Sequence, residues 1–156
     1  MVWYNILFVL RVLNVLLCSK LKGIIKLKKG EDTSMKILVV EDNPMNFELV
    51  SDLLEVRGHT VIRAVTGKEA LEAVSKETPD LILMDIQIPE IDGLTVTKML
   101  KSDERFKNIP VIALTAHAIK GYEEEIKNAG CNGYITKPID VKNFVKQVEE
   151  FFKSSE

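Results

Sequence analysis

The sequence predicts an α/β fold, a (βα)5 doubly wound parallel sheet with helices on both faces. Two observations predict it. Five short runs rich in aliphatic and β-branched residues recur between residues 35 and 156, and a segment with apolar residues at helical spacing follows each run. Parallel strands need a long crossover between them, usually a helix, so this regular alternation indicates a parallel sheet.

The first β-α unit begins at Lys36–Val40, a β-branched run that predicts a buried strand. Asp42 or Asn43 can cap the next helix, because both side chains accept hydrogen bonds from free backbone N–H groups. Pro44 suits the first turn of that helix. Apolar residues then recur at helical spacing as far as Gly58, a residue type that commonly ends a helix.

The second and third units repeat the pattern. Thr60–Val65 predicts a strand, and Thr66 opens the helix that follows it. Leu81–Met84 is wholly apolar, which predicts a strand buried on both faces and ending at Asp85. A loop rich in turn residues comes next, and then a helix over Thr95–Lys101.

The last two units complete the sheet. Val111–Leu114 and Gly133–Thr136 predict strands, a helix is expected over Ile119–Ala129, and Asp140 is expected to cap a final helix. Right-handed crossovers then give the flavodoxin-like strand order 2-1-3-4-5. Ligands of such sheets bind outside the carboxyl ends of the strands, so functional residues are expected just after each strand.

Length and composition exclude several classes of protein. The 156 residues suit one domain with a short appendage and are too few for a two-domain enzyme. Cys18 and Cys131 are too few for a disulfide framework, and two histidines cannot supply a histidine-rich metal centre. Residues 35–156 carry 15 basic and 21 acidic side chains, so we expect no binding of nucleic acid.

Residues 1–34 form an apolar and basic extension that differs from the rest of the chain. Its apolar run, residues 2–18, is short for a membrane span and holds Arg11 at its middle, although a helix lying in a membrane surface also fits. A purine-rich ribosome-binding sequence can encode Lys29–Glu31, shortly before Met35. We interpret residues 1–34 as leader DNA translated from a misplaced start, with a membrane anchor as the alternative, and residues 35–156 as the working domain.

One group of polar side chains lies at the expected strand ends: Glu41, Asp42, Asp85, Thr115 and Lys137. The first and third strands are predicted neighbours, so the carboxylates of Glu41, Asp42 and Asp85 are expected to meet. Two unit charges about 4 Å apart repel by about 4 kcal/mol at an effective dielectric of about 20. Lys137 offsets part of this repulsion, and the rest indicates a hard divalent cation such as Mg²⁺. A hydroxyl, an ammonium and a metal around a carboxylate suit phosphoryl transfer to that carboxylate.

Four stretches carry a family resemblance: KILVVEDNP, DLILMDIQIPEIDG, IPVIALTA and YITKPID. They resemble receiver domains of bacterial two-component response regulators, in the CheY-like superfamily. The resemblance covers nearly all of residues 35–152 and is closest to DivK-like single-domain regulators and to the receivers of hybrid histidine kinases. It implies a cytoplasmic phosphoacceptor switch rather than an enzyme, with a histidine kinase or histidine phosphotransfer protein upstream and a protein target downstream.

The resemblance also implies roles for individual residues. Asp85 resembles the aspartate that takes a phosphoryl group from a phosphohistidine. Asp42, Asp85 and the backbone carbonyl of Gln87 resemble direct Mg²⁺ ligands, and Glu41 would hold the metal through water. Lys137 resembles the lysine that pairs with the acceptor carboxylate and then with the phosphoryl group.

Other positions would act after phosphorylation. Thr115 and Tyr134 resemble the switch pair, in which the hydroxyl moves onto the phosphoryl group and the ring turns inward. Gln87 and His117 occupy places that modulate loss of the phosphoryl group in the family. By the same analogy the Lys137–Pro138 bond is cis.

Simpler alternatives remain for these residues. Glu41 and Asp42 can be carboxylates at a helix start, and Thr115 and Tyr134 can serve strand packing alone.

The main alternative function is an aspartate-nucleophile, metal-dependent phosphatase, which would want a second aspartate where Gln87 stands. A flavin-binding electron carrier shares the fold, but Glu41 and Asp42 would repel the flavin phosphate.

Overall fold

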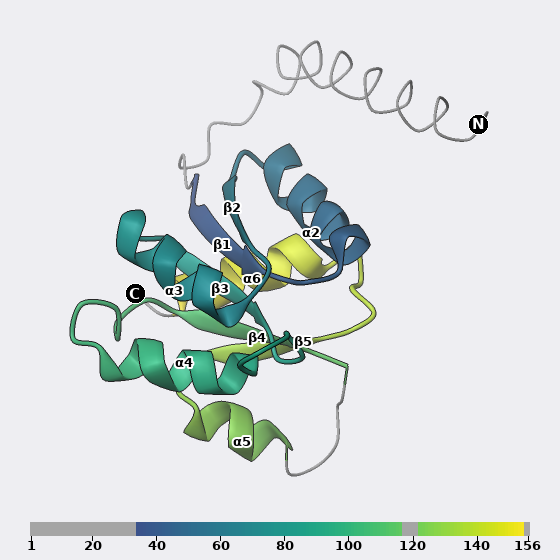
Figure 1. The fold of residues 1–156 in the computed structure, drawn as a ribbon. Helices are drawn as coiled ribbons and strands as arrows, with labels where there is room; N and C mark the ends of the chain where they lie inside the picture. The colour runs from purple at the N-terminus through teal and green to yellow at the C-terminus, as the bar shows by residue number, and fades with distance from the viewer. Residues whose placement is uncertain (1–33, 117–121, 155–156) are drawn as a thin grey trace, which may run out of the picture. The chain divides into compact units, whose positions relative to one another are not determined.

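Five parallel strands form one sheet in the computed structural model, which describes residues 34–116 and 122–154. Their order is β2-β1-β3-β4-β5, which confirms the predicted order (Figure 1). The strands are β1 (Lys36–Val40), β2 (Thr60–Ala64), β3 (Leu81–Asp85), β4 (Val111–Thr115) and β5 (Gly133–Thr136). The helices are α2 (Pro44–Val56), α3 (Gly67–Lys76), α4 (Gly93–Ser102), α5 (Tyr122–Asn128) and α6 (Phe144–Lys153).

Helices cover both faces of the sheet (Figure 1). Ile37 and Val39 of β1 belong to the core beneath α2 and α6, whereas Leu38 and Val40 belong to the core beneath α3 and α4. A smaller apolar cluster joins α5 to α4 and β4. β3 and β4 are buried along their whole length. Alternate side chains of the central strands therefore supply two cores, as a doubly wound sheet requires.

Capping side chains set the starts of α2 and α4. Asn43, rather than Asp42, caps α2, because its side-chain oxygen accepts hydrogen bonds from two backbone N–H groups of the first turn. The carboxylate of Asp42 is consequently left exposed and available. Helix α4 begins at Gly93, two residues earlier than predicted, because Asp92 caps it by accepting from the N–H of Thr95.

The predicted start of the last helix is wrong: α6 begins at Phe144, and Asp140 does not cap it. The Asp140 carboxylate accepts hydrogen bonds from the N–H of Lys142 and from the side chain of Asn143. The Asp140 carbonyl accepts from the N–H groups of Asn143 and Phe144. These bonds fold the segment into a separate turn before the helix, so Val141 is exposed instead of lying on the apolar helix face.

Several predictions concern residues outside the described ranges. The first is the interpretation of residues 1–34, of which the structure describes only Ser34. The others are the placement of His117 and the first turn of the helix predicted over Ile119–Ala129. Of that helix the structure describes Tyr122–Asn128. Among the described helices, none combines the length and the apolar character that a bilayer crossing needs.

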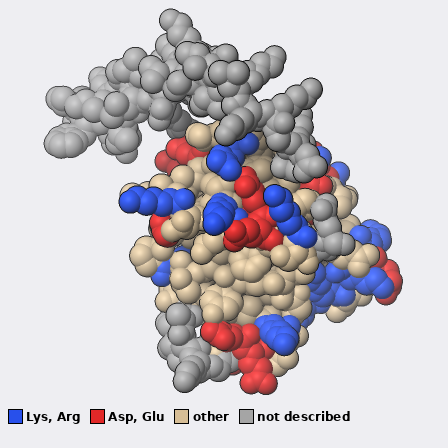
Figure 2. Space-filling model, turned by 180° about the vertical axis from the view of Figure 1, so that it is seen from behind, with Lys and Arg blue, Asp and Glu red and all other residues tan. Residues whose placement is uncertain are grey.

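Charges of both signs are intermixed on the side of the molecule that Figure 2 shows. Among the described residues, Arg57 lies 3.4 Å from Glu149 of α6, and Lys146 lies 3.6 Å from Glu150 within this helix. Exposed pairs of this kind contribute at most about 1 kcal/mol each. Glu149 has a second neighbour, His59, which is buried.

His59 lies between the residue before β1 and helix α6. Its Nδ1 accepts a hydrogen bond from the Met35 N–H at 3.2 Å, and its Nε2 lies 3.5 Å from a carboxylate oxygen of Glu149. Burial lowers the pKa of His59, although the charge of Glu149 opposes the shift and that of Arg57 supports it. The folded state therefore favours the neutral imidazole, since a proton on Nδ1 would take away the acceptor of Met35.

The free energy of unfolding is expected to fall as the pH drops below about 6.5, because the unfolded chain then binds a proton that folded His59 resists. Above that pH the imidazole is neutral in both states and contributes nothing. Urea unfolding at about pH 7.5 and about pH 5.5 should show a smaller fall for His59→Gln than for the wild type. Glu149→Gln should steepen the fall, because Glu149 raises the pKa of His59. An equal fall in the wild type and His59→Gln would contradict the assignment.

Candidate functional site

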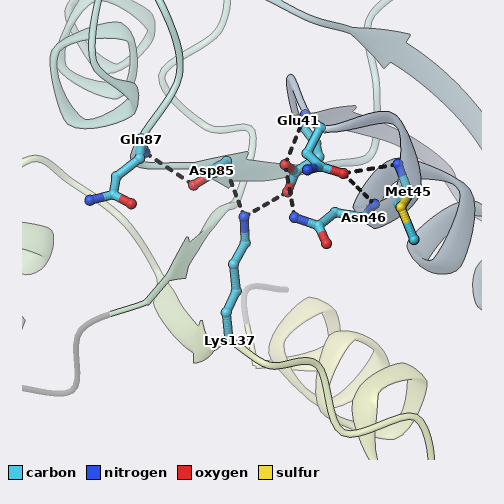
Figure 3. A network of polar contacts seen from close by, with 7 residues as sticks. Glu41, Met45, Asn46, Asp85, Gln87 and Lys137 are labelled. Atoms are coloured by element: carbon cyan, nitrogen blue, oxygen red, sulfur yellow. Dashed lines mark hydrogen bonds and ion pairs between the residues drawn. The ribbon is translucent and has the colours of Figure 1, made fainter.

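Three carboxylates from two neighbouring strands meet at the carboxyl edge of the sheet, and Figure 3 shows two of them, Glu41 and Asp85. Asp85 is the last residue of β3, and Glu41 and Asp42 directly follow β1. The register pairs Val40 with Met84, which brings Glu41 level with Asp85. One carboxylate oxygen from each of the three lies within 4.8 Å of the other two. Glu41 and Asp85 are buried, with 1% and 4% of their surface exposed, whereas Asp42 is open to solvent.

Lys137 joins two of these carboxylates from the end of β5 (Figure 3). Its Nζ donates to Glu41 Oε2 at 2.7 Å and to Asp85 Oδ2 at 2.6 Å. Burial raises the pKa of Asp85, against the opposing hydrogen bonds from Lys137 and Gln87. Burial alone would lower the pKa of Lys137, but its hydrogen bonds to Asp85 and Glu41 and their charges outweigh that effect and raise it. One ammonium thus serves two buried carboxylates.

Backbone and amide groups fix the remaining carboxylate oxygens. Asp85 Oδ1 accepts a hydrogen bond from the Gln87 N–H at 3.0 Å. Glu41 Oε1 accepts from the Asn43 N–H at 3.2 Å and from the Asn46 side-chain amide at 3.3 Å. Asn46 was not among the residues that the sequence pattern singled out. Its place in the first turn of a helix that starts at a strand end was the available signal, because helical side chains point back toward the N-terminus.

Thr115 and the Lys137 backbone complete the edge. Thr115 ends β4, is buried, and accepts the Lys137 N–H through its carbonyl at 2.7 Å. The Lys137–Pro138 bond is cis, which confirms that prediction. Thr115 and Lys137 therefore stand at the carboxyl ends of adjacent strands, where the prediction from strand ends placed them.

Tyr134 of β5 makes its polar contact with α5. Its hydroxyl donates to Glu123 at 2.6 Å, and this hydrogen bond and the charge of Glu123 raise the pKa of Tyr134. The ring packs against the apolar cluster of Ile126 and Ala113. The residue pattern alone did not indicate this pairing between β5 and α5.

The residues present fit a hard divalent cation. Glu41, Asp42 and Asp85 carry three negative charges, and Lys137 supplies one positive charge against them. Carboxylate and carbonyl oxygens are the ligands that Mg²⁺ prefers, with water completing the octahedron. Asp42 is exposed and can turn toward an ion at low cost, so the cluster could hold a metal.

A groove of about 420 Å³ opens beside the carboxylates, between α2 and the segment after β5. Its walls are largely apolar and include Leu49, Val50 and Ile139. Glu41 and Lys137 also line it. An incoming group can therefore approach the carboxylate cluster from this side.

Comparison with known proteins agrees with this geometry. The profile of the response regulator receiver domain family matches residues 37–149. The polar-differentiation response regulator DivK of Brucella ovis is 50% identical over 115 residues, which cover 74% of this chain and 94% of DivK. The DivK proteins of Brucella suis and Brucella abortus match to the same extent.

Solved structures give the same picture. A putative response regulator from Chloroflexus aurantiacus superposes with a TM-score of 0.74 at 30% identity, covering 78% of this chain and 99% of that one. The receiver domain of a sensor histidine kinase from Pseudomonas aeruginosa superposes with a TM-score of 0.71 at 31% identity, with the same coverage. That second structure has a magnesium ion coordinated in its active site cleft.

Proposed function

Because this chain belongs to the response regulator receiver domain family, we propose that Asp85 accepts a phosphoryl group from a phosphohistidine of its partner. The chain is a DivK-like response regulator of two-component signalling. The observation that carries the proposal is the Lys137 bridge, which holds Asp85 beside Glu41 at the carboxyl edge of the sheet. The donor would be a histidine kinase or a histidine phosphotransfer protein.

In the proposed step an Asp85 oxygen attacks the phosphorus atom. A P–O bond forms while the P–N bond breaks, and its electron pair leaves with the imidazole nitrogen. Lys137 then pairs with a phosphoryl oxygen, and Thr115 donates its hydroxyl to another. The charged side chains of the site need to move little during the transfer, because phosphoryl transfer depends mainly on positioning and charge stabilisation.

We propose Asp42, Asp85 and the backbone carbonyl of Gln87 as direct ligands of Mg²⁺, with Glu41 holding it through water. The 4.8 Å grouping of the three carboxylates supports this set. When bound, Mg²⁺ neutralises charge on the transferring phosphoryl group. Lys137 would pair with Asp85 before the transfer and with the phosphoryl group after it, since the metal alone cannot balance the three carboxylates.

Phosphorylation would act as a switch. The added group brings about −1.5 to −2 charges and three acceptor oxygens, which favour one of two existing loop arrangements. Thr115 would move toward those oxygens, and Tyr134 would give up Glu123 and turn inward. The altered surface of α5, β5 and α6 would then bind a protein target. We infer a cytoplasmic switch that loses its phosphoryl group slowly, rather than an enzyme, with Gln87 and His117 modulating that loss.

We propose residues 35–156 as the working unit. Buried residues of one continuous core run from Met35 to Val148, and the partly buried Phe152 packs against it, which supports independent folding of this part. The mass of the native protein tests the boundary. A chain that begins at Met35 supports translated leader DNA, and one that begins at Met1 supports the membrane-anchor hypothesis for residues 1–34.

An intact-mass spectrum tests the function. Incubation with Mg²⁺ and a small acyl-phosphate donor is expected to add one phosphoryl mass, and a chelator is expected to reduce the adduct at least tenfold, because charge neutralisation is lost. Rapid turnover of a generic phosphate ester without a stable adduct would overturn the proposal in favour of a phosphatase. Folded protein that gains no adduct with Mg²⁺ present would overturn it as well.

A further inference from the structure

We propose that Asn46 is a positioning residue, whose amide orients Glu41 so that the carboxylate cluster binds its metal. The inference rests on the proposed function, because it assigns Asn46 a part in the same site. Asn46 Nδ2 donates to Glu41 Oε1 at 3.3 Å, while Glu41 Oε2 accepts from Lys137 at 2.7 Å (Figure 3). The two oxygens of one carboxylate are thus held from opposite directions.

Glu41 needs this support because it is buried on a flexible stem. Only 1% of its surface is exposed, so water cannot replace a missing donor freely. Without Asn46, Oε1 would keep the Asn43 N–H, at 3.2 Å, as its donor among the described residues. Oε1 would then have one donor instead of two, and the carboxylate would be less firmly oriented, although Lys137 still holds Oε2.

The chemistry of the position favours a neutral donor. A lysine there would also donate to Glu41, but its charge would cancel part of the negative charge that attracts the metal. An aspartate would repel Glu41 at this distance. An amide supplies the hydrogen bond and leaves the net charge of Glu41, Asp42 and Asp85 unchanged. Asn46 also lines the groove beside Lys137, so its side chain belongs to the mouth of the site.

Calorimetric titration with Mg²⁺ tests the inference. Asn46→Leu, which keeps the size but loses the donor, is expected to weaken Mg²⁺ binding about tenfold, the usual effect of losing a hydrogen bond to a charged group. Asn46→Gln keeps an amide donor and should recover most of the affinity. Asn46→Lys should bind Mg²⁺ more weakly than Asn46→Gln. Asp52→Ala, at an exposed site on the same helix, is the matched control and should equal the wild type.

Two further readouts separate the possible failures. At saturating Mg²⁺, Asn46→Leu should gain the phosphoryl adduct at nearly the wild-type rate, and its melting curve should match that of Asp52→Ala. If the wild type forms the adduct and Asn46→Leu binds Mg²⁺ within twofold of it, the positioning role is wrong and the proposed function stands. If Asn46→Gln is as weak as Asn46→Leu, the donor is not what matters, and the inference is overturned. If the wild type itself forms no adduct, the proposed function fails first.

Discussion

Asp85→Asn is expected to abolish the phosphoryl adduct at every Mg²⁺ concentration. Asparagine keeps the shape of the side chain but replaces the attacking carboxylate oxygen with a neutral amide, which is a far weaker nucleophile. Its carbonyl oxygen can still accept from Lys137 or from the Gln87 N–H, the two donors that Asp85 uses. Intact-mass spectra of the two proteins after equal incubation measure the effect, and we expect the variant to show no adduct above background.

Loss of the adduct should not come from loss of the fold. Burial raises the pKa of Asp85, so the folded protein already resists its charge, and removing that charge relieves repulsion from Glu41. Lys137 keeps its partner Glu41 at 2.7 Å and is not left as an unpaired buried cation. The free energy of unfolding is therefore expected to change by only about 1 kcal/mol.

Asp42→Asn is the matched control for the acceptor assignment. Asp42 is exposed and contributes a carboxylate to the cluster, but it does not contact Lys137 in any described hydrogen bond. Its variant should form the adduct slowly at low Mg²⁺ and recover as Mg²⁺ is raised. An adduct that persists in Asp85→Asn, or one that Asp42→Asn cannot recover, would contradict the division of roles between acceptor and ligand.

The site could be predicted where it depends on strand ends alone. Glu41, Asp42 and Asp85 each follow a short apolar run, and parallel strands bring such positions to one edge whatever the details of packing. Lys137 could be predicted for the same reason, because it directly follows the last strand. The strand order that makes Glu41 level with Asp85 follows from the alternation of strands and helices, which leaves few topologies open.

Side-chain contacts between elements could not be predicted in the same way. Asn46 contacts Glu41 only because the first turn of α2 lies beside the end of β1, and the residue type alone does not predict this contact. Tyr134 and Glu123 meet across β5 and α5, and their contact exists only once these elements pack on a shared apolar cluster. Asp140 was a plausible cap by residue type, but it stabilises a turn, because local hydrogen bonds compete with the helix for the same carboxylate.

Gly93→Ala is expected to lower the free energy of unfolding by about 3 kcal/mol or more, at the upper end for overpacked positions. A Cβ on Gly93 would overlap the carbonyl oxygen of Asp85, and it would lie 3.0 Å from the carbonyl carbon of Asp85 and 2.9 Å from Met84 Cγ. The nearest obstacle is backbone, which cannot rotate away as a side chain can. The Gly93 N–H also donates to the Ile86 carbonyl at 2.9 Å, so α4 cannot move outward without breaking that bond.

Gly58→Ala separates this steric effect from the general cost of replacing glycine. Gly58 has a φ of +91° and nothing within 4 Å of its added Cβ, so alanine there meets only backbone strain of about 1–2 kcal/mol. Urea unfolding of the two variants should rank Gly93→Ala as clearly the less stable, and a reversed order would contradict the close approach of α4 to β3. Since the atoms displaced in Gly93→Ala belong to Asp85 itself, the folded fraction of that variant should also form the phosphoryl adduct more slowly than Gly58→Ala, because a shift of the acceptor by about 1 Å can cost a hundredfold in rate.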